Sequence, residues 1–201
     1  MNILALDTSA GTSVAIARDG VTLARRDESD TRGHAEAVGR LVSEVLAEAQ
    51  LVAADLDLVV VGVGPGPFTG LRVGIAAGIG LAAGIERPVV GVPSHDAVAL
   101  ARLEIEPTAT TVITDARRRE VFVTDYSGLD AHGLPVAAAD ARTEPRAWAD
   151  DRPEPVVAEV PAAQLAHIAW LRQQAGVPQR GTDPIYVRQP DVSRAKPKRV
   201  L

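Results

Sequence analysis

Residues 58–63 read Leu-Val-Val-Val-Gly-Val, an uninterrupted apolar run that is rich in β-branched side chains. A strand of this kind has no polar face, so it belongs in a sheet that is covered on both sides, as the strands of largely parallel sheets are. A glycine-proline loop and a helix-like segment that ends near residue 84 follow the run. Strand, loop and helix in this order predict an α/β protein.

Periodic segments on both sides of this run extend the prediction. The first half reads strand-strand-strand-helix-strand-helix-strand, with Asp19-Gly20 as a hairpin signal because both residues tolerate a positive φ. The second half repeats this order imperfectly, with only a turn around Trp148 where a helix is expected. We predict a first domain over residues 1–104 and a second, shortened domain over residues 105–201. The predicted strands are residues 3–7, 12–18, 21–27, 58–63, 88–92, 109–115, 120–126, 134–138 and 155–159, and the predicted helices include 34–49 and 162–174.

The composition narrows the function. Hydrophobic residues make up 46% and charged residues 23% of the 201 residues, which is enough apolar material for a folded core. The absence of cysteine excludes disulfides, thiolate metal sites and cysteine nucleophiles. A net charge of -5 argues against a surface that binds nucleic acid throughout. No signal-peptide pattern opens the sequence and no apolar run approaches the ~20 residues of a membrane span, so we expect a cytoplasmic protein with no membrane contact.

The segment Gly62-Val-Gly-Pro-Gly-Pro-Phe-Thr-Gly70 is the densest local signal. A loop of this kind before a helix can direct backbone amides at an anion. It is not a P-loop, because Gly70 is followed by Leu71-Arg72 instead of lysine and a hydroxyl residue. It is not a dinucleotide fingerprint either, because the third glycine comes one residue late. An anion cradle and a tight turn that needs glycine both stay open.

The helix after this loop carries a ridge of small residues at Gly70, Gly74 and Gly78. Each glycine costs a helix ~1 kcal/mol relative to alanine, so a close contact should offset the cost. The contact is either internal or made by another subunit. Because Gly80 and Gly84 make a second face of the helix small, we predict that the ridge is an assembly surface.

Three shorter segments could also carry chemistry. His34, at a helix start, is expected to be structural and not a metal ligand. Ser94 is expected to cap the helix that begins at His95. Residues 115–119, Asp-Ala-Arg-Arg-Arg, predict a hairpin tip that is either a solvated turn or a contact for phosphate or a partner. No catalytic triad, pair of acids or metal-ligand spacing stands out.

Four segments together resemble the TsaB (YeaZ) family, the bacterial dimerisation subunits of the tRNA threonylcarbamoyladenosine machinery. They occur in the family's order and span nearly the whole chain. Proteins of the family usually carry serine where this chain has Pro67, and another ~20–30 residues before the last helix, so the second domain is trimmed. The segments are residues 3–9, residues 61–84 with Gly-Pro-Gly-Pro-Phe-Thr-Gly-Leu-Arg, the Asp115-Ala-Arg-Arg hairpin, and Pro184-Ile-Tyr-Val-Arg188.

The resemblance implies an α/β fold of two tandem actin-like (ribonuclease-H-like) ATPase-fold domains. It implies a non-catalytic scaffold that dimerises with TsaD and, with the ATPase TsaE, supports threonylcarbamoyl transfer to the adenosine beside the tRNA anticodon. The free protein is expected to be a homodimer, and tRNA to be met only through the complex. No cofactor is expected to bind tightly, although ATP or ADP could sit at a subunit junction. The expected partner interface comprises Phe68, Thr69, Gly70, Arg72, Val73, Gly74, Ala77, Gly78, His34 and Leu41.

The same resemblance argues against chemistry by the chain itself. Asp7, Thr8 and Ser9 stand where actin-like ATPases hold phosphate and metal, and are expected to be a vestige of that turn. The second phosphate turn of those ATPases needs Asp-x-Gly, whereas residues 115–117 read Asp-Ala-Arg. The TsaD-like pattern needs a second histidine where Val38 stands. No catalytic residue and no metal are therefore expected, which opposes the two alternatives, a small actin-fold kinase or ATPase and a metallopeptidase.

The sequence ends in a basic segment. From residue 188 onward it has five basic residues against one acid, Asp191. This segment is either a solvated terminus or an electrostatic contact for tRNA in the complex. Both interpretations stay open.

Overall fold

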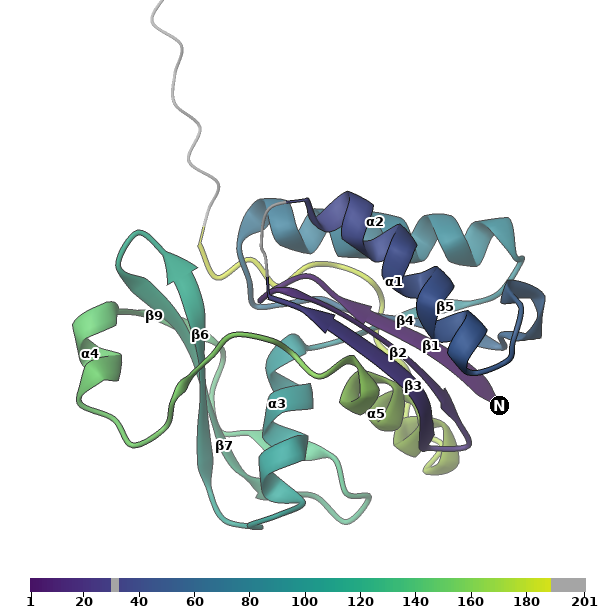
Figure 1. Cartoon of the computed structure of the whole chain (residues 1–201). Coiled ribbons are helices and arrows are strands. Elements are labelled where there is room, and N and C mark those ends of the chain that lie inside the picture. Colours follow the sequence, from purple (N-terminus) through teal and green to yellow (C-terminus); the bar gives the residue numbers. More distant parts are fainter. Residues whose placement is uncertain (30–32, 189–201) are drawn as a thin grey trace, which may run out of the picture.

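The computed structural model describes residues 1–29 and 33–188. The chain folds into two β-sheets and the helices that cover them (Figure 1). Its strands are β1 (Asn2–Asp7), β2 (Thr12–Arg18), β3 (Val21–Glu28), β4 (Leu58–Gly62), β5 (Val89–Val92), β6 (Thr110–Arg117), β7 (Glu120–Leu129), β8 (Pro135–Ala137), β9 (Arg142–Pro145) and β10 (Val156–Val157). Its helices are α1 (His34–Glu48), α2 (Phe68–Gly84), α3 (Ser94–Leu103), α4 (Arg146–Asp150) and α5 (Ala162–Gln174), with a 3-10 turn, η1, at Ala53–Asp55.

The first sheet has the strand order β3-β2-β1-β4-β5. Strands β1, β4 and β5 run parallel, and β2 and β3 are antiparallel to their neighbours. The predicted hairpin between β2 and β3 is confirmed, because Asp19 and Gly20 both have positive φ, 51° and 82°. The apolar run that predicted a buried strand is β4, which is buried throughout.

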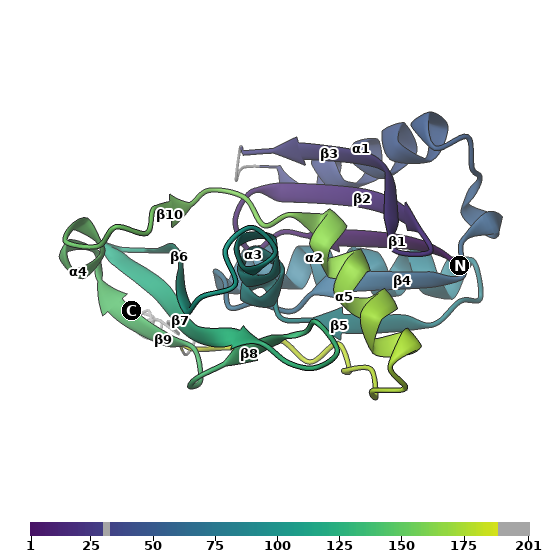
Figure 2. The ribbon, with the colours of Figure 1, turned by 90° about the horizontal axis from the view of Figure 1, so that it is seen from below.

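Helices cover both faces of this sheet. Helices α1 and α2 lie side by side on one face, and α5 lies on the other (Figures 1 and 2). Helix α3 lies between the first sheet's helix α5 and the strands β6 and β7 of the second sheet. The last predicted helix, α5, therefore packs on the sheet that the first half of the sequence forms.

Successive side chains of β1 point to opposite faces of the first sheet and belong to two different core clusters. Leu4 and Leu6 pack under α1 and α2. Ile3 and Ala5 face the opposite way, into a cluster shared with α3, α5 and the second sheet. Successive strand residues point to opposite faces, so a strand buried on both sides has no polar position.

The second sheet has the strand order β10-β6-β7-β8, and β9 also pairs with β7. Its predicted strands are confirmed, but β9 was not predicted because Arg142-Thr-Glu-Pro145 is short and carries no apolar alternation. The expected shrunken helix around Trp148 is confirmed as α4, which has five residues. The division at residue 104 and the tandem actin-like description stay predictions.

The glycine-proline loop after β4 is a tight turn that depends on glycine. Gly64 has a φ of 97°, which side chains rarely adopt. A Cβ at Gly62 would lie 1.7 Å from a carboxylate oxygen of Asp7. Of the two interpretations left open for this loop, the structure bears out the tight turn.

The glycine ridge of α2 faces the interior, which corrects the interpretation of the ridge as an assembly surface. Gly70, Gly74 and Gly78 are all buried. A Cβ at these positions would lie 2.5 Å from the Thr8 carbonyl oxygen, 2.3 Å from Thr8 Oγ1 and 2.1 Å from Val61 Cγ1, respectively. Close packing on β1 and β4 therefore explains the ridge without a partner.

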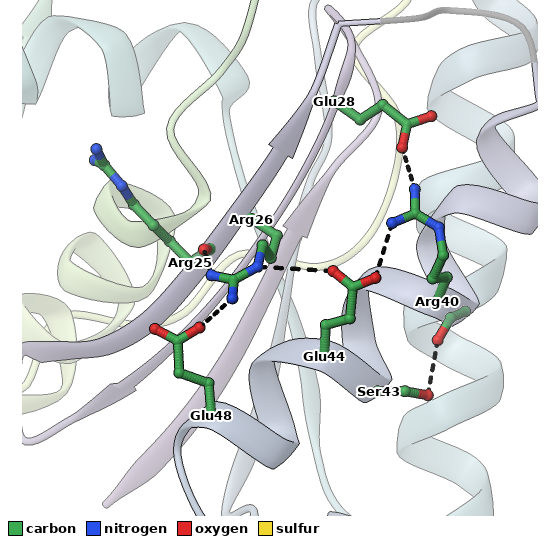
Figure 3. A network of polar contacts seen from close by, with 8 residues as sticks. Arg25, Arg26, Glu28, Arg40, Ser43, Glu44 and Glu48 are labelled. Atoms are coloured by element: carbon green, nitrogen blue, oxygen red, sulfur yellow. Dashed lines mark hydrogen bonds and ion pairs between the residues drawn. The ribbon is translucent and has the colours of Figure 1, made fainter.

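Helix α1 is tied to the edge strand β3 by a row of exposed ion pairs (Figure 3). Arg26 contacts Glu48 at 2.5 Å and Glu44 at 3.7 Å. Arg40 contacts Glu44 at 2.9 Å and also pairs with Glu28. Exposed pairs each contribute little to stability. The position of α1 on the sheet is set by its buried face, where Val38, Leu41 and Val45 join the core.

No helix within the described residues is long and apolar enough to cross a lipid bilayer. Most of the basic terminal segment, residues 189–201, lies outside the described residues. Both interpretations of that segment therefore stay predictions.

Candidate functional site

The turn after β1 is held by hydrogen bonds to its own fold. Asp7 is buried, and its Oδ1 accepts hydrogen bonds from the Ser9 backbone N–H at 2.7 Å and the Ser9 hydroxyl at 2.5 Å. Its Oδ2 accepts a hydrogen bond from the Ser94 hydroxyl at 2.5 Å. Ser94 Oγ in turn accepts one from the Gly64 N–H at 3.0 Å. Both carboxylate oxygens of Asp7 thus have partners within the protein.

Ser94 does not cap α3, which corrects the sequence-based expectation. The N-cap position is Pro93, and no side chain caps the helix there. Ser94 is the first helical residue, and its hydroxyl instead joins Asp7 to the loop after β4. Spacing alone could not show that a buried carboxylate 87 residues away competes for this hydroxyl.

Thr8 inserts its hydroxyl into the first turns of α2. Its Oγ1 donates a hydrogen bond to the Gly70 carbonyl oxygen at 2.6 Å and accepts one from the Gly74 N–H at 3.0 Å. These are the two backbone groups that an undisturbed helix would pair with each other. Thr8 therefore fixes α2 against β1, and its hydroxyl has no role left open toward a phosphate.

Burial raises the pKa of Asp7 above its ordinary value, although hydrogen bonds from Ser9 and Ser94 act in the opposite direction. Both oxygens of Asp7 already accept hydrogen bonds from Ser9 or Ser94, so a metal ion would have to displace these donors. Within the described residues, no three histidine or acidic side chains gather as metal ligands would. The residues of this turn therefore do not fit a metal-bound nucleotide by themselves.

A cleft of about 490 Å³ opens beside this turn, between the two sheets' loops. Thr8 and Ser9 line one side, and Asp115, Arg117 and Arg146 line the other. In place of the Asp-x-Gly of a phosphate turn, the second side thus presents two arginines and a carboxylate. His34 also lines the cleft, and its Nδ1 is hydrogen-bonded to Thr12 Oγ1 at 2.8 Å.

The expected interface residues separate into three groups. Gly70, Gly74, Gly78 and Leu41 are buried, and Leu41 belongs to the core under α1 and α2. Thr69 and Arg72 are exposed, and Phe68, Val73, Ala77 and His34 are half-buried. The structure thus leaves six of the ten accessible to a partner.

Sequence reasoning missed the contact that closes this end of α2. The Arg72 guanidinium lies 3.7 Å over the Phe68 ring, and its Nε donates a hydrogen bond to the Tyr186 hydroxyl at 3.0 Å. The Tyr186 and Phe68 rings lie 5.1 Å apart. The Ile185 N–H also donates to the Val63 carbonyl oxygen at 2.7 Å. The sequence drew attention to Tyr186 only through the family resemblance at residues 184–188, and that resemblance did not indicate that Tyr186 contacts α2.

A second polar cluster, also missed, lies at the start of α3. His95 is buried, with Nδ1 at 2.8 Å from Thr124 Oγ1 and Nε2 at 2.9 Å from Thr114 Oγ1. Burial lowers the pKa of His95 to about 3, so its ring is neutral at pH 7. Next to it, the Tyr126 hydroxyl donates to Asp96 Oδ1 at 2.7 Å, and burial raises the pKa of Asp96 to about 6.

The fold and the site together define a two-sheet α/β protein whose turn residues serve its own packing. Comparison with known proteins agrees with the resemblance. The family model for TsaD, tRNA N6-adenosine threonylcarbamoyltransferase, matches residues 23–175. The solved structure of YeaZ from Pseudomonas aeruginosa has a TM-score of 0.77 and 26% identity, over 92% of this chain and 99% of that one.

Two curated relatives extend the comparison. An uncharacterized protein of Mycobacterium tuberculosis strain H37Rv is 40% identical over 97% of this chain and 94% of its own length. The tRNA threonylcarbamoyladenosine biosynthesis protein TsaB of Escherichia coli is 36% identical over 67% of this chain and 58% of its own length. The chain belongs to the TsaB (YeaZ) family, within the wider family that the TsaD model describes.

Proposed function

We propose that this chain is a non-catalytic scaffold of tRNA threonylcarbamoyladenosine biosynthesis, which docks TsaD and, with TsaE, supports threonylcarbamoyl transfer to tRNA. The similarity to TsaB proteins and to the TsaD family model supports the pathway and the partner. The internal use of Asp7 and Thr8 supports the absence of catalysis. The modification of tRNA takes place in the complex, inside the cytoplasm.

The observation that carries the docking role is the outer face of α2. Ala76, Ile79, Gly80 and Ala83 are exposed, and Ile79 is 41% exposed. Apart from its chain neighbours and the nearby backbone of α2 itself, no atom lies within 4 Å of a Cβ built on Gly80, so the packing that explains Gly74 does not explain this glycine. An exposed helix face of small apolar residues allows another backbone to approach closely.

Helix α1 completes this surface along one side. It lies beside α2 (Figure 1) and adds half-buried Val42 and Leu46. The buried residues Val38, Leu41 and Val45 hold α1 on the sheet. Arg72 lies in the first turns of α2 and is exposed. The same surface serves a second copy of the chain when TsaD is absent, which gives the homodimer.

A nucleotide is not held tightly by this chain alone in the proposed role. Both carboxylate oxygens of Asp7 are taken up by hydrogen bonds from Ser9 and Ser94, and an arginine replaces the glycine of a phosphate turn at Arg117. ATP or ADP would bind only where a second subunit completes the cleft.

The test is TsaD docking by the variant Gly80→Arg. The open space around Gly80 accommodates the side chain without disturbing the fold, so far-UV circular dichroism should match the wild type. We expect at least a tenfold loss of affinity for TsaD in titration calorimetry, equivalent to about 1.4 kcal/mol. Ile105→Arg, at a site that is 87% exposed and beyond α3, is the matched control and should dock normally.

Two outcomes would contradict the proposal. Docking of Gly80→Arg with wild-type affinity would remove α2 from the interface. ATP turnover by the purified chain that Asp7→Asn abolishes would favour the alternative, a small actin-fold kinase or ATPase.

A further inference from the structure

A second pocket, of about 400 Å³, lies at the tip of the β6–β7 hairpin. Three arginines and three aromatic rings line it, and none of its described lining residues is acidic. The whole sequence has two Phe, two Tyr and two Trp, so half of its aromatic residues meet here. We call this site the hairpin-tip pocket; the residues that define it are Arg117, Arg118, Arg188, Phe68, Phe122 and Tyr186.

Positive charge is concentrated around this pocket. Arg119 follows the lining arginines, and its carbonyl oxygen accepts a hydrogen bond from the Arg146 N–H at 2.7 Å. Among the described residues, three carboxylates pair with these arginines: Asp115, which lies 3.5 Å from Arg117 and 4.0 Å from Arg146, Asp150, which lies 3.8 Å from Arg146, and Glu120, which pairs with Arg188. Within the described part of the chain, five arginines thus lie with three carboxylates, in a protein whose net charge is -5. Such a local excess attracts phosphate groups.

The backbone of the tip is held in an unusual conformation. Arg117, Arg118 and Arg119 have φ values of 63°, 55° and 64°, three consecutive non-glycine residues in the left-handed region. Each such residue is disfavoured, and a run persists only where its surroundings determine it. The Asp115 carboxylate accepts the Arg117 N–H at 3.1 Å, and Arg146 holds Arg119. The arginines therefore project from a fixed turn, which lowers the entropic cost of binding an anion.

The aromatic side of the pocket is also fixed. Arg72 contacts both Phe68 and Tyr186, and the Tyr186 side chain remains 40% exposed. An exposed ring beside arginines is the combination that single-stranded nucleic acids use, with bases on rings and phosphates on cations. An acidic protein partner would use the arginines but would not need the rings.

We infer that the hairpin-tip pocket binds a single-stranded segment of RNA, with Arg117 and Arg118 on its phosphates and a base on Tyr186. An extended strand is favoured over a mononucleotide, because three arginines and three aromatic rings line the same pocket. Naming RNA as the polyanion rests on the proposed role in tRNA modification. The inference goes beyond that role by giving this chain an RNA contact of its own.

The test measures binding of a labelled single-stranded RNA of about 12 nucleotides by fluorescence anisotropy. Salt is varied between about 50 and 200 mM with the full chain. The double variant Arg117→Ala/Arg118→Ala should lower the log–log salt slope by about 0.7 for each arginine. Arg18→Ala/Arg25→Ala removes the same charge from the exposed β2 and β3 positions and should leave the slope unchanged.

The ring is tested separately. Tyr186→Ala should weaken RNA binding about tenfold, whereas Tyr186→Phe, which keeps the ring, should bind as the wild type does. Equal slopes for the tip variant and the control variant would overturn the inference, as would the absence of wild-type binding at about 50 mM salt. Displacement of the RNA by poly-glutamate or AMP at equal charge would also overturn it.

TsaD docking is measured in parallel on the arginine variants. We expect Arg117→Ala/Arg118→Ala to dock normally, because these residues belong to the β6–β7 hairpin and the proposed docking face lies on α2 and α1; Tyr186→Ala is left out of this comparison, because Tyr186 contacts Arg72 and Phe68 of α2. A wild-type chain that binds RNA through the tip but does not dock TsaD would contradict the proposed function alone. A chain that docks TsaD but shows no effect of the tip variants would contradict the RNA site alone.

Discussion

At the scale of single residues, α2 shows that identical glycines in one helix can have opposite roles. Gly70 faces β1, where a Cβ would lie 2.5 Å from the backbone carbonyl oxygen of Thr8. Gly80 faces outward, where a Cβ would meet no atom within 4 Å. The sequence shows the spacing of these glycines but not which way each faces, because an almost wholly apolar helix has no polar side to orient it.

This contrast gives a paired prediction for stability. Gly80→Ala should raise the free energy of unfolding by about 0.5–1 kcal/mol, because alanine restricts the unfolded chain and meets no obstruction. Gly70→Ala should lower it by about 1–3 kcal/mol, since the obstructing atom belongs to the backbone. Urea denaturation of both variants measures the difference. Destabilisation by Gly80→Ala would mean that the outer face of α2 is not open in the folded chain.

At the scale of elements, Asp96 connects α3 to β7 of the second sheet through Tyr126. Burial raises the pKa of Asp96 from its ordinary 3.8 to about 6. Between these two values the folded chain holds a proton that the unfolded chain releases, so stability falls as pH rises from about 4 to about 6. The two-unit difference corresponds to about 3 kcal/mol.

The variant Asp96→Asn should remove this pH dependence. Asparagine keeps an oxygen to accept the Tyr126 hydroxyl and carries no charge to bury. Its stability relative to the wild type should therefore increase between pH 4 and pH 6 and stay constant above. Denaturant titrations at several pH values check this. The free energy of unfolding of the variant is compared with that of the wild type at the same pH, because His95 contributes equally to the pH dependence of both proteins. A difference between the two that stays constant from pH 4 to pH 6 would contradict the prediction.

The elements themselves were largely predictable, because apolar periodicity and turn residues mark them locally. Helix α1 and strands β1, β2 and β4 follow the predicted ranges within one residue. Strand β9 was missed, since its polar residues pair with β7 without an apolar pattern. For the candidate site, the sequence indicated which residues belong to it but not which of them contact one another. That Asp7 would bind Ser94, and that Tyr186 would close over Arg72, depends on contacts across 87 and 114 residues, which no local pattern encodes.

At the scale of the whole molecule, the two halves of the sequence share one core. Helix α5 lies on the face of the first sheet opposite α1 and α2 (Figure 2). Its first N–H, at Ala162, donates to Ser13 Oγ at 3.1 Å, and His167 is hydrogen-bonded to the Gly20 carbonyl oxygen at 3.1 Å. The cluster that includes Ile3 and Ala5 also includes Leu165 and Ile168 of α5. The first sheet thus depends on a helix that begins nearly sixty residues after position 104.

This shared core predicts how the chain responds to division. A fragment of residues 1–104 leaves one face of its sheet uncovered, so we expect it to bind a hydrophobic dye and to unfold without a cooperative transition. The full chain should unfold in one transition, because its two halves share one core. Tryptophan fluorescence reports on the second half, since Trp148 and Trp170 both lie beyond residue 104, and circular dichroism reports on the whole chain. The two signals should therefore change at the same denaturant concentration. Adding the fragment 105–201 should restore cooperativity by supplying α5. A fragment 1–104 that unfolds cooperatively alone would show instead that the predicted boundary separates two autonomous domains.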